Sequence, residues 1–308
     1  MDRRRFLQAI PASMAAAPFM RGVAFGQASI PAHRSKFKQA ITKQVFGAKA
    51  TTEDCCREAV RIGFQGFDFA DDPSDWPILK KYGLLQTMYR VDAPRLATPP
   101  APGSGPAAKP PGWDAIGWKE AQGDFLKACH GGIDTCAANG FPCFLLQCGA
   151  RSDAFSLEQG ADNAVEFCNQ LKSHAEDKGV MLCVENLNSK GFGLIKTSLF
   201  DHIGWGVGVI KRVNSPRVKV LYDIWQAQLM DGDIVQTLRD NIQYIGHIHT
   251  GGVPGRHQID DSQELNYGFI ARVLDELGFT GYVAHEWSPS PGSDPIANAQ
   301  KAFDIMNV

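Results

Sequence analysis

Short apolar runs alternate with longer amphipathic stretches along most of the chain. Runs such as Val180–Glu185 and Val218–Asp223 are almost continuously apolar, which is typical of strands that are covered on both faces. Stretches such as Leu157–Lys178 repeat apolar residues at helical spacing. Strands that alternate with helices predict parallel βαβ units. The expected strands are Phe37–Thr42, Gly66–Phe69, Leu84–Tyr89, Cys143–Gln147, Val180–Glu185, Val218–Asp223, Ile245–His249 and Tyr282–Glu286.

The amphipathic stretches between these strands are the expected helices. Eight strand–helix units fit one closed barrel, which usually takes about 250 residues. We therefore predict a single α/β domain, a (β/α)₈ TIM barrel, over residues 29–308. An open doubly wound sheet is the alternative, and the lack of a G-x-G-x-x-G motif after an early strand disfavours it. The clearest helices are Glu53–Ile62, Lys119–Ala138, Leu157–Lys178, Asp233–Asn241 and Tyr267–Leu277, and four of the helical stretches end at Gly63, Gly140, Gly179 or Gly278.

The first residues have the pattern of an export signal. Arg3-Arg4-Arg5 precede an apolar, alanine-rich run, and small residues follow at Gly26–Ala28. Paired arginines are typical of the twin-arginine route, which carries folded proteins. We expect residues 1–28 to be a signal peptide and the mature protein to be periplasmic or secreted. No later stretch approaches the about 20 apolar residues that a membrane span needs, so we expect no membrane association after the signal is removed.

The net charge limits the expected partners, and the cysteine spacing indicates the state of the thiols. The formal net charge of −2 gives no basic excess, which argues against a nucleic-acid partner. The eight cysteines include no C-x-x-C pair and fall in apolar strands and helical patterns, so we expect buried thiols rather than disulfides. A homo-oligomer is compatible with this composition.

A proline-rich stretch over residues 93–112 interrupts the barrel pattern after the third expected strand. Loops at this end of a barrel line the site. The stretch is interpreted either as an extended, polyproline-like excursion or as a lid that brings a tryptophan over the substrate.

Each of the last four expected strands ends in a side chain that can bind a metal. The carboxyl ends of barrel strands meet at one mouth, so these side chains should converge there. Carboxylates at the ends of apolar strands are costly unless they are paired or coordinated. Three hard oxygen ligands and one imidazole suit Mn²⁺, Mg²⁺ or Co²⁺. We predict one divalent ion, Mn²⁺ before Mg²⁺ or Co²⁺, bound by four strand-end residues: Glu185, Asp223, His249 and Glu286.

The motifs around these residues resemble those of the xylose-isomerase-like barrel superfamily, particularly hydroxypyruvate isomerases and ketose 3-epimerases. They are Val-Glu-Asn-Leu-Asn, Tyr-Asp-Ile-Trp-Gln-Ala-Gln, Gly-His-Ile-His-Thr-Gly, Pro-Gly-Arg-His and His-Glu-Trp-Ser-Pro, in that order between residues 180 and 289. The resemblance implies that Glu185 and Glu286 also move the proton and that Arg256 contacts the substrate's oxygens. His249 matches the epimerases, because hydroxypyruvate isomerases usually have glutamine there. Gln226 stands where the family commonly has a substrate-contacting histidine.

A metal on a carbonyl and its neighbouring hydroxyl would stabilise an enediolate, while a carboxylate removes or returns the adjacent proton. We therefore expect an isomerase or epimerase of a sugar or hydroxy-keto acid. The alternatives are a metal-dependent lyase that cleaves oxidised glycosides by β-elimination, and a non-catalytic sugar-binding barrel. His247 shares the inward face with His249 and joins Gln226 and Arg256 as a candidate substrate-binding residue, with support of the metal ligand as its other role.

The export signal gives the first testable prediction. Changing Arg3 and Arg4 together to Lys should leave the precursor in the cytoplasm, because the paired arginines are the recognised element. Cell fractionation and N-terminal sequencing measure this, and the wild-type mature chain should begin near Ser29. A periplasmic wild-type protein that still begins at Met1 would contradict it.

Overall fold

The structure is a computed structural model that describes residues 33–91, 115–119, 122–190 and 197–308. The expected signal peptide (1–28) and the proline-rich stretch (93–112) lie outside these residues.

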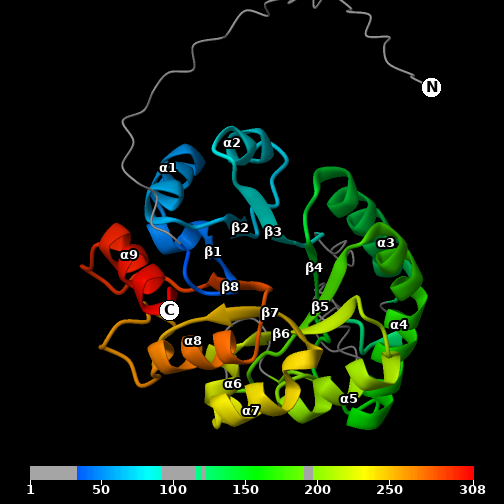
Figure 1. The fold of residues 1–308 in the computed structure, drawn as a ribbon. Helices are drawn as coiled ribbons and strands as arrows, with labels where there is room; N and C mark the ends of the chain where they lie inside the picture. The colour runs from blue at the N-terminus through cyan, green and yellow to red at the C-terminus, as the bar shows by residue number, and fades with distance from the viewer. Residues whose placement is uncertain (1–32, 92–114, 120–121, 191–196) are drawn as a thin grey trace, which may run out of the picture.

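Parallel strands close into a barrel in chain order, and the last strand pairs with the first. This confirms the predicted (β/α)₈ barrel, and no strand begins or ends more than one residue from its expected bound. Figure 1 shows the strands at the centre and the helices around them. The strands are β1 Lys38–Thr42, β2 Gly66–Asp68, β3 Leu85–Tyr89, β4 Cys143–Leu146, β5 Met181–Glu185, β6 Val218–Asp223, β7 Ile245–Thr250 and β8 Tyr282–His285.

Two of the predicted helices have well-defined starts and end at the glycines expected from the sequence. Thr51 and Ser156 form capping boxes at the starts of two helices, and Gly63 and Gly179 end the same two helices in the left-handed conformation. Within the described residues, every helix is too short or too polar to cross a bilayer. The helices are α1 Thr52–Ile62, α2 Trp76–Lys81, α3 Gln122–Asn139, α4 Leu157–Lys178, α5 Ile203–Val213, α6 Ile224–Met230, α7 Ile234–Asn241, α8 Tyr267–Glu276 and α9 Pro295–Met306, with short 3₁₀ turns η1 Lys43–Phe46 and η3 Ile242–Tyr244.

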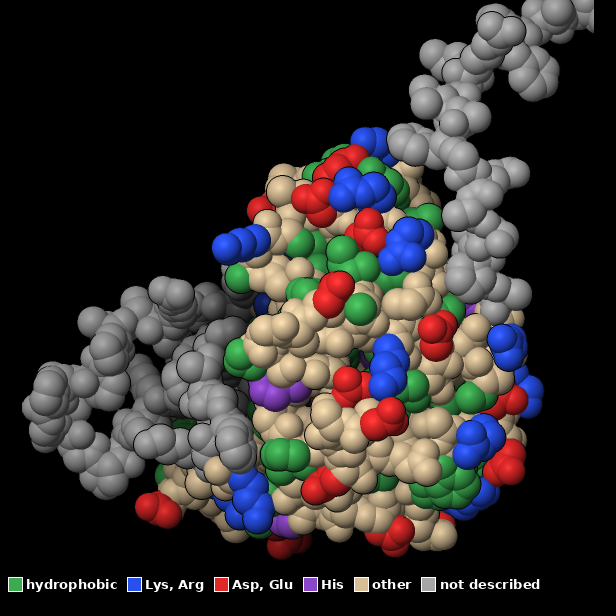
Figure 2. Space-filling model, turned by 90° about the vertical axis from the view of Figure 1, so that its left-hand side faces the viewer, with side chains coloured by type: hydrophobic (Ala, Val, Ile, Leu, Met, Phe, Trp, Pro, Cys, Tyr) green, Lys and Arg blue, Asp and Glu red, His purple; other side chains and the backbone are tan. Residues whose placement is uncertain are grey.

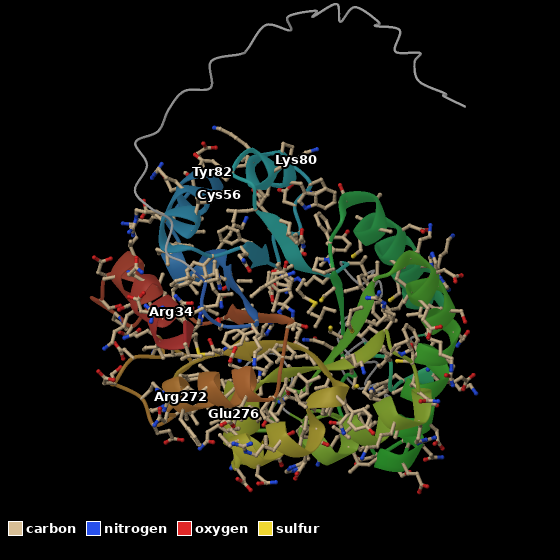
Figure 3. The ribbon with its side chains drawn as sticks, in the orientation of Figure 1. Arg34, Cys56, Lys80, Tyr82, Arg272 and Glu276 are labelled. Carbon is tan, nitrogen blue, oxygen red and sulfur yellow. The ribbon has the colours of Figure 1, made fainter. Side chains whose placement is uncertain are left out.

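The outer face of the helices is charged. Acidic and basic side chains are interspersed on the face drawn in Figure 2. Lys80 at α2 and Arg272 and Glu276 on α8 lie at the outside of the helix layer in Figure 3.

All eight cysteines are free and buried, as the sequence predicts.

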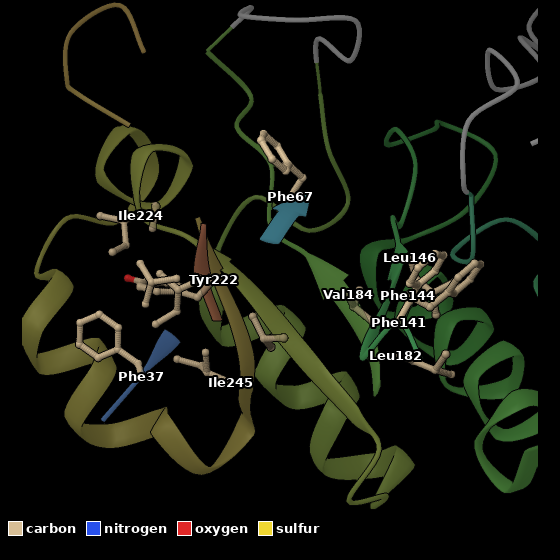
Figure 4. Packing of buried hydrophobic residues seen from close by; sticks show 14 of the residues in the cluster. Phe37, Phe67, Phe141, Phe144, Leu146, Leu182, Val184, Tyr222, Ile224 and Ile245 are labelled. Atoms are coloured by element: carbon tan, nitrogen blue, oxygen red, sulfur yellow. The ribbon is translucent and has the colours of Figure 1, made fainter. Parts of the chain in front are cut away.

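The apolar core has two parts. Outward-facing strand residues pack against the helices in one large cluster, and Figure 4 shows Phe144, Leu146, Leu182 and Val184 in it. Inward-facing strand residues form smaller clusters within the barrel. Their members are Met88, Cys143, Leu145, Cys183 and Leu221, and separately Ala40, Tyr282 and Ala284.

Two irregularities in strand pairing set which side chains meet. Between β6 and β7 the register shifts after Val220, so that Gly246 is the extra residue and Asp223 comes level with His249. A Cβ at Gly246 would lie 2.8 Å from Lys219 Cβ, so this position requires glycine. A similar shift between β2 and β3 pairs Asp68 with Met88. Such bulges redirect side chains near the rims of barrels.

Two neighbouring glycines in α3 give a matched stability test. A Cβ at Gly132 would lie 2.4 Å from the Phe144 ring, whereas a Cβ at Gly131 would meet nothing within 4 Å. Gly131→Ala should therefore stabilise the protein by about 0.5–1 kcal/mol through helix propensity. Gly132→Ala should destabilise it by about 1–3 kcal/mol because the core is overpacked. Urea unfolding measures both, and equal effects would mean that α3 does not pack on β4 through this face.

Candidate metal centre

The structure brings the four strand-end residues together at the carboxyl end of the barrel. Glu185 ends β5, Asp223 ends β6, His249 is the last residue but one of β7, and Glu286 directly follows β8. One ligand atom from each lies within 4.8 Å of the others. Barrel closure and the bulge between β6 and β7 thus put all four at one point.

The four side chains of the centre differ in exposure. Asp223 and His249 are fully buried and Glu185 is 5% exposed, whereas the Glu286 side chain is 21% exposed. Burial raises the pKa of Glu185, and the charge of Glu286 adds to this. Burial also acts to raise the pKa of Glu286, but the charges of Arg256 and then His249 lower it to about 2. The two carboxyl groups therefore stand in different electrostatic environments.

Arg256 lies against the carboxylates rather than away from them. Its Nη2 donates to Asp223 Oδ2 at 2.6 Å and to Glu286 Oε2 at 2.5 Å, and its Nε donates to the Glu286 carbonyl at 3.0 Å. The guanidinium stacks 4.8 Å above the Trp225 ring. The backbone of Arg256 has φ 55°, in the left-handed region that residues other than glycine rarely adopt. A strained backbone held by several contacts is common at functional positions.

Amide side chains surround the centre. Gln226, a predicted substrate contact, is 8% exposed, and its side-chain oxygen accepts a hydrogen bond from Asn188. Gln147 donates to Glu185 Oε2 at 2.6 Å. Asn186 binds the backbone of Asp223 through both its oxygen and its nitrogen. Gln147 was not among the predicted site residues, although it follows an apolar strand just as the four ligand candidates do.

His247 lies deeper in the barrel than the centre. It is fully buried, and its Nε2 is 2.7 Å from Asp68 Oδ2. The same Asp68 oxygen is 2.9 Å from His249 Nε2, so the three side chains form a second group of possible metal-binding type. Burial opposes ionisation of Asp68, but the charge and hydrogen bond of His247 and the hydrogen bond of His249 hold its pKa below the usual range. The structure therefore separates His247 from Gln226 and Arg256, with which the sequence grouped it.

The residues present fit a divalent ion. His249 Nδ1 is buried and has no partner in hydrogen-bond geometry, yet Glu286 Oε2 is 2.8 Å away and Glu185 Oε1 is 3.5 Å away. An imidazole nitrogen that lies close to two carboxylates without a hydrogen bond in good geometry to either is placed as a third ligand of a shared ion would be. Three carboxylates and one imidazole are the donors that Mn²⁺, Mg²⁺ and Co²⁺ accept.

Comparison with known proteins identifies the family. The xylose isomerase-like TIM barrel family matches residues 56–307, so the chain belongs to that family. A 2-oxo-tetronate isomerase of Cupriavidus necator is 33% identical over 119 residues, which are 39% of this chain and 44% of that enzyme. The chain thus spans about half the length of the curated relatives that it matches first.

Solved structures show the same fold. An AP endonuclease, family 2, from Brucella melitensis has a TM-score of 0.68 at 23% identity, and the match covers 86% of this chain and 96% of that one. The 3-keto-D-glucoside 4-epimerase of E. coli has a TM-score of 0.67 at 18% identity, over 88% of this chain and 97% of that one.

The ligand set gives a direct test. Asp223→Asn and His249→Ala should each weaken Mn²⁺ binding by more than about 100-fold. Loss of an outer hydrogen-bond partner costs about 10- to 100-fold, and loss of a direct ligand should cost more. Isothermal titration calorimetry of the purified protein measures this. Asp75→Asn is the matched control, because Asp75 is also a buried carboxylate but is bound by Lys43 and Thr52. Wild-type affinity in both ligand variants would place the metal elsewhere.

Proposed function

We propose that the chain is a divalent-metal-dependent isomerase or epimerase that moves a proton next to the carbonyl of a sugar or hydroxy-keto acid. The observation that carries the proposal is the position of two glutamates, from the ends of different strands, beside the same imidazole nitrogen. His249 Nδ1 lies 3.5 Å from Glu185 Oε1 and 2.8 Å from Glu286 Oε2. A site for binding alone has no need of two such carboxylates.

Each glutamate is fixed by a hydrogen bond to a neighbouring side chain. Gln147 binds Glu185 Oε2, which leaves Oε1 directed towards the centre. Arg256 binds Glu286, the most exposed of the four side chains. A bound divalent ion would act as a Lewis acid on the substrate's carbonyl and adjacent hydroxyl. One carboxylate would remove the proton beside the carbonyl and the other, from its different side, would return it.

The outcome depends on the carbon that receives the proton. Return to the neighbouring carbon is isomerisation, and return to the same carbon with inverted hand is epimerisation. The names of the C. necator isomerase and the E. coli epimerase support a substrate that carries a keto group.

The charges at the mouth favour an oxygen-rich substrate. A divalent ion together with Arg256 would balance the three carboxylates, so the centre would be near neutrality before substrate binds. Gln226 and Asn188 add neutral hydrogen-bonding groups, which suit hydroxyls and carbonyls.

Proton exchange tests the proposal. Glu185→Gln and Glu286→Gln should each slow deuterium incorporation next to the carbonyl by about 10²–10⁴-fold, the usual contribution of a general acid or base. NMR in D₂O with Mn²⁺ replaced by Mg²⁺ for detection measures it on keto-sugars, keto-acids and oxidised glycosides. Glu276→Gln is the control, because Glu276 lies on the outside of α8 (Figure 3) and pairs with Arg239.

The outcomes separate the alternative functions. Exchange that depends on both glutamates supports the proposal. Release of the leaving group from an oxidised glycoside would instead identify a lyase. A metal-loaded wild-type protein that exchanges no proton on any of these substrates would be a sugar-binding barrel.

A further inference from the structure

Asp68 joins two histidines inside the barrel. It ends β2, is 1% exposed, and its Oδ2 lies 2.7 Å from His247 Nε2 and 2.9 Å from His249 Nε2. The Thr87 hydroxyl donates to the other carboxylate oxygen. An ionised carboxylate has no proton to donate, so both imidazoles must donate their Nε2–H groups to it. Asp68 therefore sets the proton position on both rings.

The proton position on His249 determines which nitrogen can bind a metal. With Nε2–H committed to Asp68, Nδ1 is the nitrogen left to coordinate a metal, which displaces the proton that Nδ1 carries in the imidazolium form. Nδ1 is also the nitrogen that faces Glu286 and Glu185. The hydrogen bond from Nε2 to Asp68 thus leaves Nδ1 facing the metal centre.

Ring contacts hold His249 in this orientation. The Phe69 ring packs edge-on against it at 5.6 Å, and the His247 ring does so at 5.3 Å. Phe69 has φ 61°, a conformation that is costly for a residue with a bulky side chain. These contacts fix the plane of the ring, and a half-turn flip within that plane would break the hydrogen bond to Asp68.

The local backbone is built to bring Thr87 and Asp68 together. A Cβ at Gly66 would lie 2.5 Å from the Leu85 carbonyl oxygen and 2.7 Å from Thr87 Cγ2, so only glycine permits this approach of β2 to β3. The register shift between Phe67 and Asp68 accompanies it. A buried carboxylate is tolerated only when its hydrogen bonds are made, and here three donors from β3 and β7 make them.

We propose that Asp68 is a positioning residue that makes His249 bind the divalent ion through Nδ1, with His247 and Thr87 holding Asp68 in place. The proposal rests on the proposed function in that it concerns the same metal centre. It assigns His247 to support of the ligand rather than to contact with substrate. Outer hydrogen-bond partners of this kind orient metal-binding histidines and raise their basicity.

The coordinating nitrogen can be observed directly. Protein labelled with ¹⁵N-histidine and loaded with ¹¹³Cd²⁺ should show cadmium–nitrogen coupling to Nδ1 of His249, while Nε2 remains protonated. Asp68→Ala should weaken Mn²⁺ and Cd²⁺ binding by about 10- to 100-fold and divide the coupling between the two nitrogens. Asp68→Asn keeps a carbonyl oxygen as acceptor, so it should retain Nδ1 coordination with a smaller loss of affinity.

Leu145→Ala is the matched control for disturbance of the barrel interior. Leu145 is buried in the same interior cluster as Cys143 and Cys183. This variant should lower the melting temperature but leave the coordinating nitrogen unchanged and the affinity within about threefold, because it leaves the ligand's hydrogen bonds intact. An equal loss of affinity in Leu145→Ala and Asp68→Ala would make Asp68 a packing residue only.

Three results would overturn the proposal: coupling to Nε2 in the wild type, no metal on His249, or wild-type affinity with Nδ1 coupling in Asp68→Ala. If Asp68→Ala does not fold, the wild type and Asp68→Asn still decide the question through the coupled nitrogen. The measurement uses no substrate. Nδ1 coordination that depends on Asp68, in a protein without proton exchange, would therefore refute the proposed function and leave this inference standing.

Discussion

The mouth of the barrel depends on how three neighbouring carboxylates are neutralised. The ends of β5, β6 and β8 bring Glu185, Asp223 and Glu286 within a few ångströms of one another, and Asp223 is fully buried there. Such crowding is unfavourable unless cations and hydrogen-bond donors compensate for it. The surroundings supply donors in number: the guanidinium of Arg256, the amide of Gln147 and the backbone N–H of Gln226 all reach these carboxylates. The donor chemistry of the centre is thus matched to a divalent cation.

Much of the fold and part of this site were predictable from the sequence. Near-continuous apolar strands separated by amphipathic helices identify a closed parallel barrel, because both strand faces are covered. The same pattern places the residue at each strand's end at one mouth. For this reason the four strand-end residues were found without any knowledge of contacts, and the structure places them together.

The contacts across the barrel could not be predicted in this way. Asp68 and His247 are 179 residues apart in the chain, and they meet only because the barrel closes. The inward direction of His247 was correctly inferred from its spacing to His249, but the bulge at Gly246, which pairs His247 with Leu221, was not. Arg256 lies in a loop, and no periodicity predicts that a loop side chain will bind Asp223 and Glu286.

The residues around His249 come from both halves of the barrel, and this limits how half-barrels can be exchanged. The four strand-end residues come from β5 to β8, the C-terminal half of the barrel, whereas Asp68 comes from β2 in the N-terminal half. One histidine connects the two halves, since its ring contacts a carboxylate from each. Exchange of half-barrels between members of the family would therefore transfer all four ligands and still separate His249 from its carboxylate on β2. A chimaera would therefore keep the contact to His249 only if its N-terminal half carried an acidic residue at the end of the second strand.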